Sequence, residues 1–280
     1  MVNVIMMIDT HAHLSGLTLR GINTHQVIKE LFSTGFMGII DVSLEPGDLS
    51  SRINEFSCYD GVRFASGLWP WTDSITNREK LLGELEKSLF IEPGPENAHQ
   101  TGIINPAICA LGEFGLDHNW NGEGKEGSAD LKGERELMEM QMDIALRLKL
   151  PVIIHSRDAA GETEKILKHY PGVCGVVHCF SYGPEEAKAF LDLGYYISFA
   201  GNITYKNARN IQDACRLIPN DKLLLETDCP YLAPVPHRGK PAHPGMVEEV
   251  YKKTAELRKT NIETLACQIK KNVETLFGIL

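Results

Sequence analysis

The chain has 280 residues, of which 43% are hydrophobic and 23% are charged. This composition is typical of a globular protein, and the length allows either two small domains or one large α/β domain with a large buried core. The formal net charge of −9 disfavours a polyanionic partner held by the overall electrostatic field. Any nucleic-acid site must therefore be local or must depend on bound metal ions.

The seven cysteines indicate a reducing compartment. Their number is odd, their spacing is irregular and no C-x-x-C motif occurs, which predicts free thiols. The N-terminus has neither the basic segment nor the cleavage site of a signal peptide, and no stretch approaches the roughly 18 apolar residues of a membrane span. We predict a cytoplasmic location and no membrane partner. The sequence leaves the oligomeric state open and is compatible with a monomer. The cysteines are at positions 58, 109, 174, 179, 215, 229 and 267.

Short apolar runs typical of buried strands alternate with amphipathic stretches typical of helices from the start of the chain. The stretch 24–36, for example, places Val27, Ile28 and Leu31 on one helical face. A turn is predicted at 45–47 and a loop at 92–105, because both are rich in turn-forming residues. In this part the predicted strands are 4–9, 36–42, 62–68 and 107–112, and the predicted helices are 24–36, 49–56 and 77–90.

The same alternation continues to the end of the chain. The segment 119–133 is rich in glycine and charge and is predicted to be a mobile loop rather than a domain linker. Four further strands are predicted at 151–155, 173–178, 194–199 and 222–226. The predicted helices are 134–148, 162–170, 184–193, 208–217, 246–259 and 262–277.

Eight strand–helix units within one chain favour a single (β/α)8 TIM-type barrel that comprises residues 1–280 as one domain. A doubly wound open sheet is the alternative. Such sheets usually bind a nucleotide through a G-x-G-x-x-G turn after the first strand, whereas this turn reads DTHAH (9–13). The barrel is therefore the preferred prediction.

Two histidines follow the first predicted strand in an H-x-H pattern. Side chains on an extended chain alternate between faces, so His11 and His13 point in the same direction and can bind one cation together. Two surface histidines near the start of the chain are the simpler interpretation, and the pair alone does not decide between them.

Further residues of the type that binds metals follow other predicted strands. In a barrel the carboxyl ends of all strands meet at one face, so we expect these side chains to converge there. Each one alone has an ordinary explanation as a salt-bridged or hydrogen-bonded residue, but so many buried ionisable groups would be costly without a partner. Six ligands exceed the number that one open catalytic zinc needs, which favours two cations with a bridging carboxylate and water. The six residues are His11, His13, Glu113, His155, His178 and Asp228.

Several motifs together resemble those of the TatD family of metal-dependent hydrolases, and the resemblance extends over essentially the whole chain. Members of this family have an amidohydrolase-like barrel, and several are deoxyribonucleases. The motifs are DTHAHL (9–14), GEFGLD (112–117), PVIIHSRDA (151–159), HCF (178–180) and ETDCPYLAP (226–234).

The resemblance implies a role for each of the six residues. His11, His13 and Asp228 would hold the first metal, and His155 and His178 would hold the second. Glu113 would bridge the two metals, and Asp228 would also accept a proton from the attacking water. The predicted catalytic residues are therefore Asp228 and Glu113, and the predicted cofactor is two divalent cations, either zinc, manganese or magnesium.

The chain departs from the family pattern at three places that we expect to contact substrate. Ser15 replaces an acidic residue after the H-x-H-Leu segment, His118 replaces a tyrosine after GLD, and RGKPAHP (238–244) lacks the usual asparagine and acidic residue. Arg157, Arg238 and His118 are the predicted substrate-binding residues, because the arginines could clamp phosphate oxygens.

Three functions remain open from the sequence. The preferred one is a deoxyribonuclease that removes nucleotides from DNA through a water bridging two metals. The second is hydrolysis of a carbonyl substrate, such as an amide, a lactone or an aminoacyl-tRNA ester, with the same metal pair. The third is a metal-binding module without catalytic activity.

Overall fold

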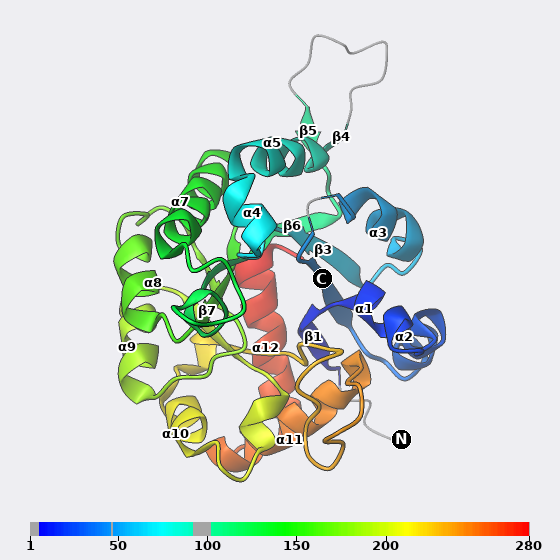
Figure 1. Cartoon of the computed structure of the whole chain (residues 1–280). Helices are drawn as coiled ribbons and strands as arrows, with labels where there is room; N and C mark the ends of the chain where they lie inside the picture. The colour runs from blue at the N-terminus through cyan, green and yellow to red at the C-terminus, as the bar shows by residue number, and fades with distance from the viewer. Residues whose placement is uncertain (1–5, 46, 92–101, 280) are drawn as a thin grey trace.

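Eight parallel strands form a nearly closed barrel in the computed structural model, which describes residues 6–45, 47–91 and 102–279 (Figure 1). The strand order is β1-β2-β3-β6-β7-β8-β9-β10, and every pairing is parallel. The predicted (β/α)8 barrel is confirmed. The barrel strands are β1 (Ile8–Ala12), β2 (Gly38–Ser43), β3 (Val62–Ser66), β6 (Ile108–Asp117), β7 (Val152–Arg157), β8 (Gly175–Val177), β9 (Tyr196–Phe199) and β10 (Leu223–Leu225).

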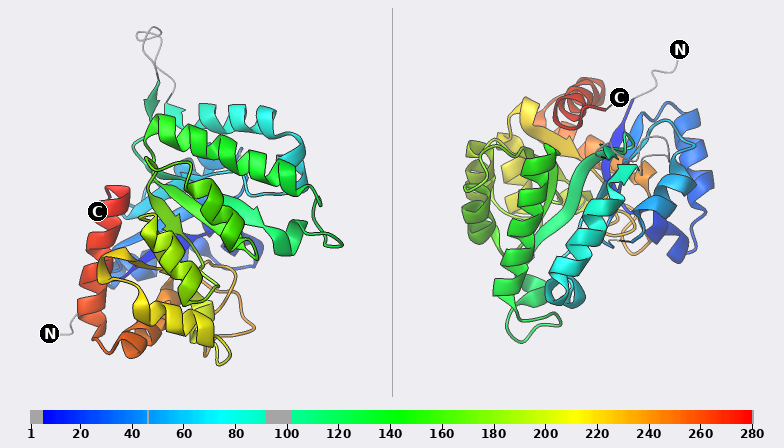
Figure 2. Two further views of the ribbon diagram at one scale, coloured as in Figure 1. Left: turned by 90° about the vertical axis from the view of Figure 1, so that its left-hand side faces the viewer. Right: turned by 90° about the horizontal axis from the view of Figure 1, so that it is seen from above.

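Helices surround the barrel (Figures 1 and 2). Amphipathic sequences turn their apolar faces to the strands, and side chains cap several helices: Asn23, Asp130 and Asn261 accept hydrogen bonds from backbone N–H groups of α2, α7 and α12. The helices are α1 (Leu14–Leu19), α2 (Thr24–Ser33), α3 (Leu49–Phe56), α4 (Thr72–Thr76), α5 (Arg78–Ser88), α6 (His118–Asn121), α7 (Leu131–Leu148), α8 (Ala160–Leu167), α9 (Pro184–Asp192), α10 (Arg209–Leu217), α11 (Val247–Arg258) and α12 (Ile262–Phe277).

The last helix lies across the end of the barrel at which the strands begin. In Figure 1, α12 passes behind the ring of strands, and in the side view of Figure 2 it lies at one edge of the molecule. Asn272 of α12 is buried and donates a hydrogen bond to the carbonyl of Leu223 at the start of β10, at 2.7 Å. This end is therefore covered, and the carboxyl ends of the strands face the other way. Within the described ranges, no helix combines the length and the apolar character that crossing a membrane requires.

The first and last strands meet at a seam that side chains complete. The regular ladder is reduced here to one parallel bridge between Ala12 and Cys229. The hydroxyl of Thr10 donates to the carbonyl of Leu225 at 3.0 Å, and the backbone N–H of His13 donates to the carbonyl of Cys229 at 2.8 Å. The seam thus joins the H-x-H segment directly to the segment after β10.

Three strands extend further toward their carboxyl ends than predicted. β1 continues to Ala12, β6 to Asp117 and β7 to Arg157, so the predicted ends at 9, 112 and 155 are wrong. His11 and Glu113 consequently lie inside strands rather than after them, and His155 lies within β7 rather than at its end. Residues 4 and 5 of the first predicted strand, residue 46 of the turn and residues 92–101 of the loop lie outside the described residues.

Two predicted loops contain regular structure. Within the segment predicted as a loop at 92–105, β5 (Ile103–Ile104) forms a short antiparallel pair with β4 (Phe90–Ile91). The predicted loop at 119–133 begins within α6 and ends within α7. The short helices α1 and α4 were not predicted, because five or six residues are too few for a helical pattern to be recognised.

Candidate metal centre

The first group of metal-type donors combines β1 with the segment after β10. The Nε2 atoms of His11 and His13 lie 3.3 Å apart, and the Nε2 of His13 lies 3.3 Å from Oδ1 of Asp228. One donor atom from each of these three residues lies within 4.8 Å of the other two. The structure thus brings together residues from the two ends of the barrel sheet.

Backbone contacts fix the orientation of this first group. The Nδ1 of His13 lies 2.8 Å from the carbonyl oxygen of Val42, which can only accept a hydrogen bond. Nδ1 of His13 therefore carries a proton, and its Nε2 is the atom that faces the other donors. The backbone N–H of Asp228 donates to the carbonyl of His11 at 3.0 Å, which ties the carboxylate to the histidine strand.

The second group comes from three consecutive strands of the barrel. Glu113 lies in β6, His155 lies in β7 and His178 directly follows β8. Oε1 of Glu113 lies 3.0 Å from both the Nδ1 of His155 and the Nε2 of His178, and these two nitrogens are 3.3 Å apart. Neighbouring parallel strands therefore direct three donors to one point.

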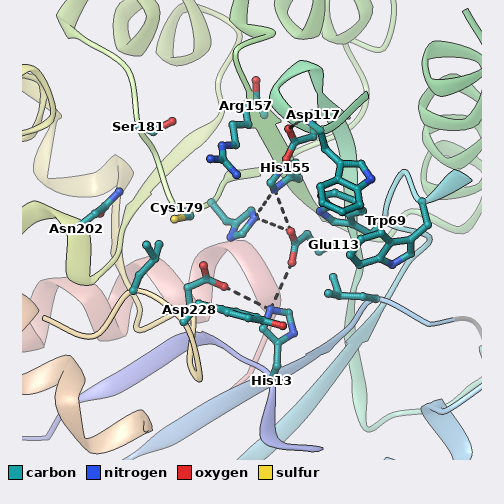
Figure 3. A pocket seen from close by; sticks show the side chains of 17 residues that line it. His13, Trp69, Glu113, Asp117, His155, Arg157, Cys179, Ser181, Asn202 and Asp228 are labelled. Carbon is teal, nitrogen blue, oxygen red and sulfur yellow. Dashed lines mark hydrogen bonds and ion pairs between the residues drawn. The ribbon is translucent and has the colours of Figure 1, made fainter. Parts of the chain in front are cut away.

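Glu113 is shared between the two groups (Figure 3). Its Oε1 faces His155 and His178, whereas its Oε2 lies 3.0 Å from Nε2 of His11 and 3.6 Å from Nε2 of His13. Each oxygen of one carboxylate therefore faces a different pair of imidazoles. This division is the arrangement expected of a carboxylate that bridges two cations.

Two glycines allow the backbone around Glu113 to approach β7. Gly112 has φ of +132°, and a Cβ on it would lie 2.6 Å from the carbonyl oxygen of Ile153. Gly115 has φ of +153°, and a Cβ there would collide with the carbonyl oxygen of His155. Residues with side chains rarely adopt such φ values, so the GEFG sequence is needed to place Glu113 beside His155.

Burial and mutual attraction together set the charges of the centre. Burial alone would raise the pKa of Glu113, but the positive charge of His178 and hydrogen bonds from the histidines hold this pKa well below its ordinary value. Burial likewise opposes ionisation of Asp228, whose pKa is nevertheless lowered, first by a hydrogen bond with His13. Both carboxylates are therefore ionised near neutral pH, which is the state that binds cations.

Two further carboxylates hold the histidines of the second group. Oδ2 of Asp117 lies 3.0 Å from Nε2 of His155, so Nδ1 of His155 is the atom that faces Glu113. Oε1 of Glu226 lies 3.4 Å from Nδ1 of His178 and accepts a hydrogen bond from the backbone N–H of Cys179 at 2.7 Å. Carboxylates in these positions orient a histidine ring and strengthen it as a ligand.

Replacing Asp117 by Asn is expected to weaken metal binding at the second group about 10- to 100-fold, because the anionic acceptor for Nε2–H of His155 is lost. Titration calorimetry with Zn²⁺ or Mn²⁺ would measure the change in affinity. The matched control is Asp158→Asn, which alters an exposed carboxylate that accepts a hydrogen bond from Asn119. Equal affinities in both variants would show that Asp117 has no part in holding the ring.

The residues present fit a pair of divalent cations. Neutral imidazole nitrogens and ionised carboxylate oxygens are the usual ligands of zinc and manganese. The closest donor pairs within each group are 3.0 to 3.3 Å apart. Two donors that are each about 2.1 Å from a tetrahedral cation are separated by about 3.4 Å, so the observed spacing agrees with metal coordination.

A cavity of about 550 Å³ opens onto the centre. Arg157 lines this cavity and faces it from the end of β7, as predicted for a substrate contact (Figure 3). The other two predicted substrate contacts do not line it. Nε2 of His118 points between Glu134 and Glu162, at 3.7 and 3.8 Å from their carboxylates, and the guanidinium of Arg238 stacks on the ring of Tyr205 at 4.2 Å.

Several lining residues were not assigned a role from the sequence. A signal existed for Asp117: residues 113, 115 and 117 share one face of a strand, which places this acid beside Glu113. The others are Ser156 in β7, Trp120 in α6, Asn202 in a 3-10 helix, and Leu44, Trp69, Trp71, Cys179, Ser181, Tyr231 and Leu232 in loops, where no periodicity indicates which way a side chain points.

Comparisons with known proteins agree with this geometry. The family model described as TatD-related DNase matches residues 8–278. The chain is 32% identical over 276 residues to the uncharacterized metal-dependent hydrolase YabD of Bacillus subtilis, covering 98% of this chain and 100% of that protein. The crystal structure of YJJV, a TatD homologue from Escherichia coli, matches with a TM-score of 0.82 and 26% identity over 99% of this chain and all of the other. An uncharacterized amidohydrolase of Saccharomyces cerevisiae has the same barrel fold, with a TM-score of 0.75 and 16% identity over 98% of this chain and 100% of that one.

Proposed function

We propose, from the premise that this chain belongs to the TatD-related DNase family and is a metal-dependent hydrolase, that it hydrolyses phosphodiester bonds and removes nucleotides from the end of a DNA strand. The observation that carries the proposal is the division of the Glu113 carboxylate between two pairs of histidines at the base of a cavity. Paired cations at such a site suit the displacement of an oxygen at phosphorus.

Two divalent cations would be held by the two groups. His11, His13 and Asp228 would bind the first, and His155 and His178 would bind the second, with Glu113 shared between them. Zinc and manganese suit this mixture of nitrogen and oxygen ligands, and magnesium becomes suitable when phosphate adds oxygens. The chemistry that such cations supply is acidification of water and neutralisation of charge that develops on phosphate oxygens.

The side chains of this chain would perform the remaining steps. The carboxylate of Asp228 is ionised and lines the cavity, so it can accept the proton that the attacking water loses. Arg157 reaches the cavity from the end of β7 and can bind a phosphate oxygen. The cavity volume, about 550 Å³, suits one nucleotide and its neighbouring phosphate rather than double-stranded DNA.

A substrate screen with the metal-loaded protein tests the proposal. We expect release of mononucleotides from end-labelled single-stranded DNA in Mg²⁺, Mn²⁺ or Zn²⁺, and loss of this release when a chelator is added. A parallel panel of amides, lactones and aminoacyl esters covers the carbonyl hydrolases. Hydrolysis of that panel alone would replace the DNase proposal, and no turnover of any substrate would indicate a binding module.

Activity on DNA is expected to depend only weakly on salt concentration. Arg157 is the one lysine or arginine that lines the cavity among the residues that the structure describes. A single contacted phosphate on a single strand gives a slope of about −0.7 in a plot of log(kcat/KM) against log[salt]. Measurement between about 50 and 200 mM NaCl at constant metal concentration would check this value, and a slope several times steeper would require further cationic contacts outside the cavity.

A further inference from the structure

All three tryptophans of the chain form one wall of the cavity, which we call the tryptophan wall. Trp69 and Trp71 lie in the loop between β3 and α4, and Trp120 lies in α6. The ring centroids of Trp69 and Trp71 are 4.1 Å apart, and those of Trp71 and Trp120 are 5.6 Å apart at an interplanar angle of 88°. Two loops that are distant in the sequence therefore present one continuous aromatic surface.

This wall adjoins the metal-type donors. The ring of Trp69 lies 5.4 Å from the ring of His155, and Figure 3 places Trp69 on the side of the cavity opposite Ser181 and Asn202. The indole N–H groups of Trp71 and Trp120 are shielded, yet they have no hydrogen-bond partner among the described residues. Buried indole groups in a packed core usually find a partner. These N–H groups are out of reach of a ligand, so the wall offers a bound molecule the apolar faces and edges of its rings.

The wall is held rigidly before any ligand binds. The side-chain amide of the buried Asn121 donates to the carbonyl of Pro70, between the first two tryptophans, at 2.8 Å and to Oε1 of Glu134 at 2.9 Å. The N–H of Gly127 donates to the carbonyl of Trp120 at 2.8 Å. Rings that are already ordered lose little conformational entropy when they bind a planar group.

Acidic residues next to the tryptophan wall disfavour a DNA strand that continues beyond it. Trp71 also lines a second cavity, and its other lining residues include four acidic side chains. Arg52 and Lys80 pair with two of the four, but no lysine or arginine lines this cavity within the described ranges. A phosphodiester chain that continued past Trp71 would therefore meet net negative charge. The four acidic residues are Glu45, Asp48, Asp73 and Glu84.

We infer that the tryptophan wall is a stacking site for the base of the terminal nucleotide of a DNA strand, and that it makes an intact terminal base a requirement for efficient cleavage. This inference rests on the proposed DNase function. Three observations support it: the aromatic surface beside the metal donors, the cationic side chain of Arg157 in the lining of the same cavity, and the acidic residues past Trp71, which favour a strand that ends at the wall. Stacking accepts every base, because each base has an aromatic face.

Trp71→Ala and Trp71→Phe provide the kinetic test. The substrates are two single-stranded oligonucleotides that differ only in an abasic residue at one terminus, with each terminus tested in turn. For the substrate with an intact base, we expect Trp71→Ala to lower kcat/KM about 5- to 150-fold. Trp71→Phe should retain most of the activity, since phenylalanine also stacks. The wild-type enzyme should cleave the abasic substrate with a similar loss, and Trp71→Ala should add little to it.

Fluorescence provides a second readout that does not need turnover. Because every tryptophan lies in the wall, tryptophan emission excited at a wavelength where tyrosine does not absorb reports only on this site. Titrating the metal-loaded protein with a deoxynucleoside monophosphate should change the emission at concentrations where deoxyribose 5-phosphate does not. Tyr59→Ala, an aromatic substitution between α3 and β3 that does not line the cavity, serves as the control.

The results separate this inference from the proposed function. Equal losses for Trp71→Ala on intact and abasic termini, or equal fluorescence responses to the two phosphates, would overturn the stacking site. A chromogenic aryl phosphodiester is included because its hydrolysis reports the metal chemistry itself. If it is hydrolysed while base and abasic termini are cleaved equally, only the stacking site is refuted. If the protein cleaves no phosphodiester with any metal, the DNase function fails, and a normal fluorescence response would then support only the nucleotide-binding wall.

Discussion

Replacing Asp228 by Asn is expected to lower kcat about 10²- to 10⁴-fold, because an amide cannot accept the proton that the attacking water loses. The substitution preserves the size of the side chain. It removes the negative charge from a position 3.3 Å from Nε2 of His13, so the first group should bind metal more weakly. Glu113, His155 and His178 remain unchanged, and the variant should still retain metal at the second group.

Two measurements on the Asp228→Asn variant are needed together. Steady-state kinetics gives kcat, and elemental analysis of the purified protein gives the amount of metal that each variant retains. Asp213→Asn is the matched control, since Asp213 is an exposed carboxylate on α10 that pairs with Arg216. Undiminished turnover in Asp228→Asn would refute the assignment of this residue as the proton acceptor.

Replacing Glu113 by Gln is expected to have an even larger effect, because both groups lose an anionic ligand at once. Loss of a residue that only hydrogen-bonds to a metal ligand typically weakens metal binding by about 10- to 100-fold. Loss of a ligand that both groups share should therefore weaken binding by more than this at each group. Turnover should fall below detection. In a thermal unfolding experiment, added Mn²⁺ or Zn²⁺ should raise the Tm of the wild-type protein but not that of Glu113→Gln.

The control for this experiment is Glu256→Gln on α11, which changes an exposed carboxylate that pairs with Lys253 and does not line the cavity. It should show the same metal-dependent rise in Tm as the wild type. A Glu113→Gln variant that is still stabilised by two equivalents of metal would disprove the bridging role. Such a result would favour two independent metal sites to which Glu113 does not contribute an essential ligand.

The sequence predicted the barrel well because the same local pattern, an apolar strand followed by an amphipathic helix, recurs along the chain. The helices at 49–56 and 262–277 have the predicted bounds, and in the second case Asn261 provides a recognisable cap. The strand ends were predicted too early for a physical reason. Polar residues usually end an apolar run, but the carboxyl halves of β1, β6 and β7 line a polar centre, so these strands continue past the predicted ends at Asp9, Gly112 and His155.

The convergence of the six predicted ligands also followed from the sequence, because parallel strands of a barrel end at one face. The residues that line the substrate cavity were harder to predict from the sequence. Arg238 and His118 were chosen as charged or unusual residues in loops, but they contact Tyr205 and acidic side chains instead of the cavity. The tryptophans went unassigned because the contact between Trp71 and Trp120 depends on how two loops fold over the barrel, which no local pattern records.

The seam between β1 and β10 has a consequence for how the protein is made. The first group of donors needs His11 and His13 to pair with the segment around Asp228, and the seam bonds that do this span 218 residues of sequence, as between Asp9 and Thr227. A ribosome-bound nascent chain therefore holds its first histidines without their acidic partner until nearly the whole barrel has been synthesised. Binding of a cation by this first group would therefore come late in the synthesis of the protein, after β10 has closed the barrel.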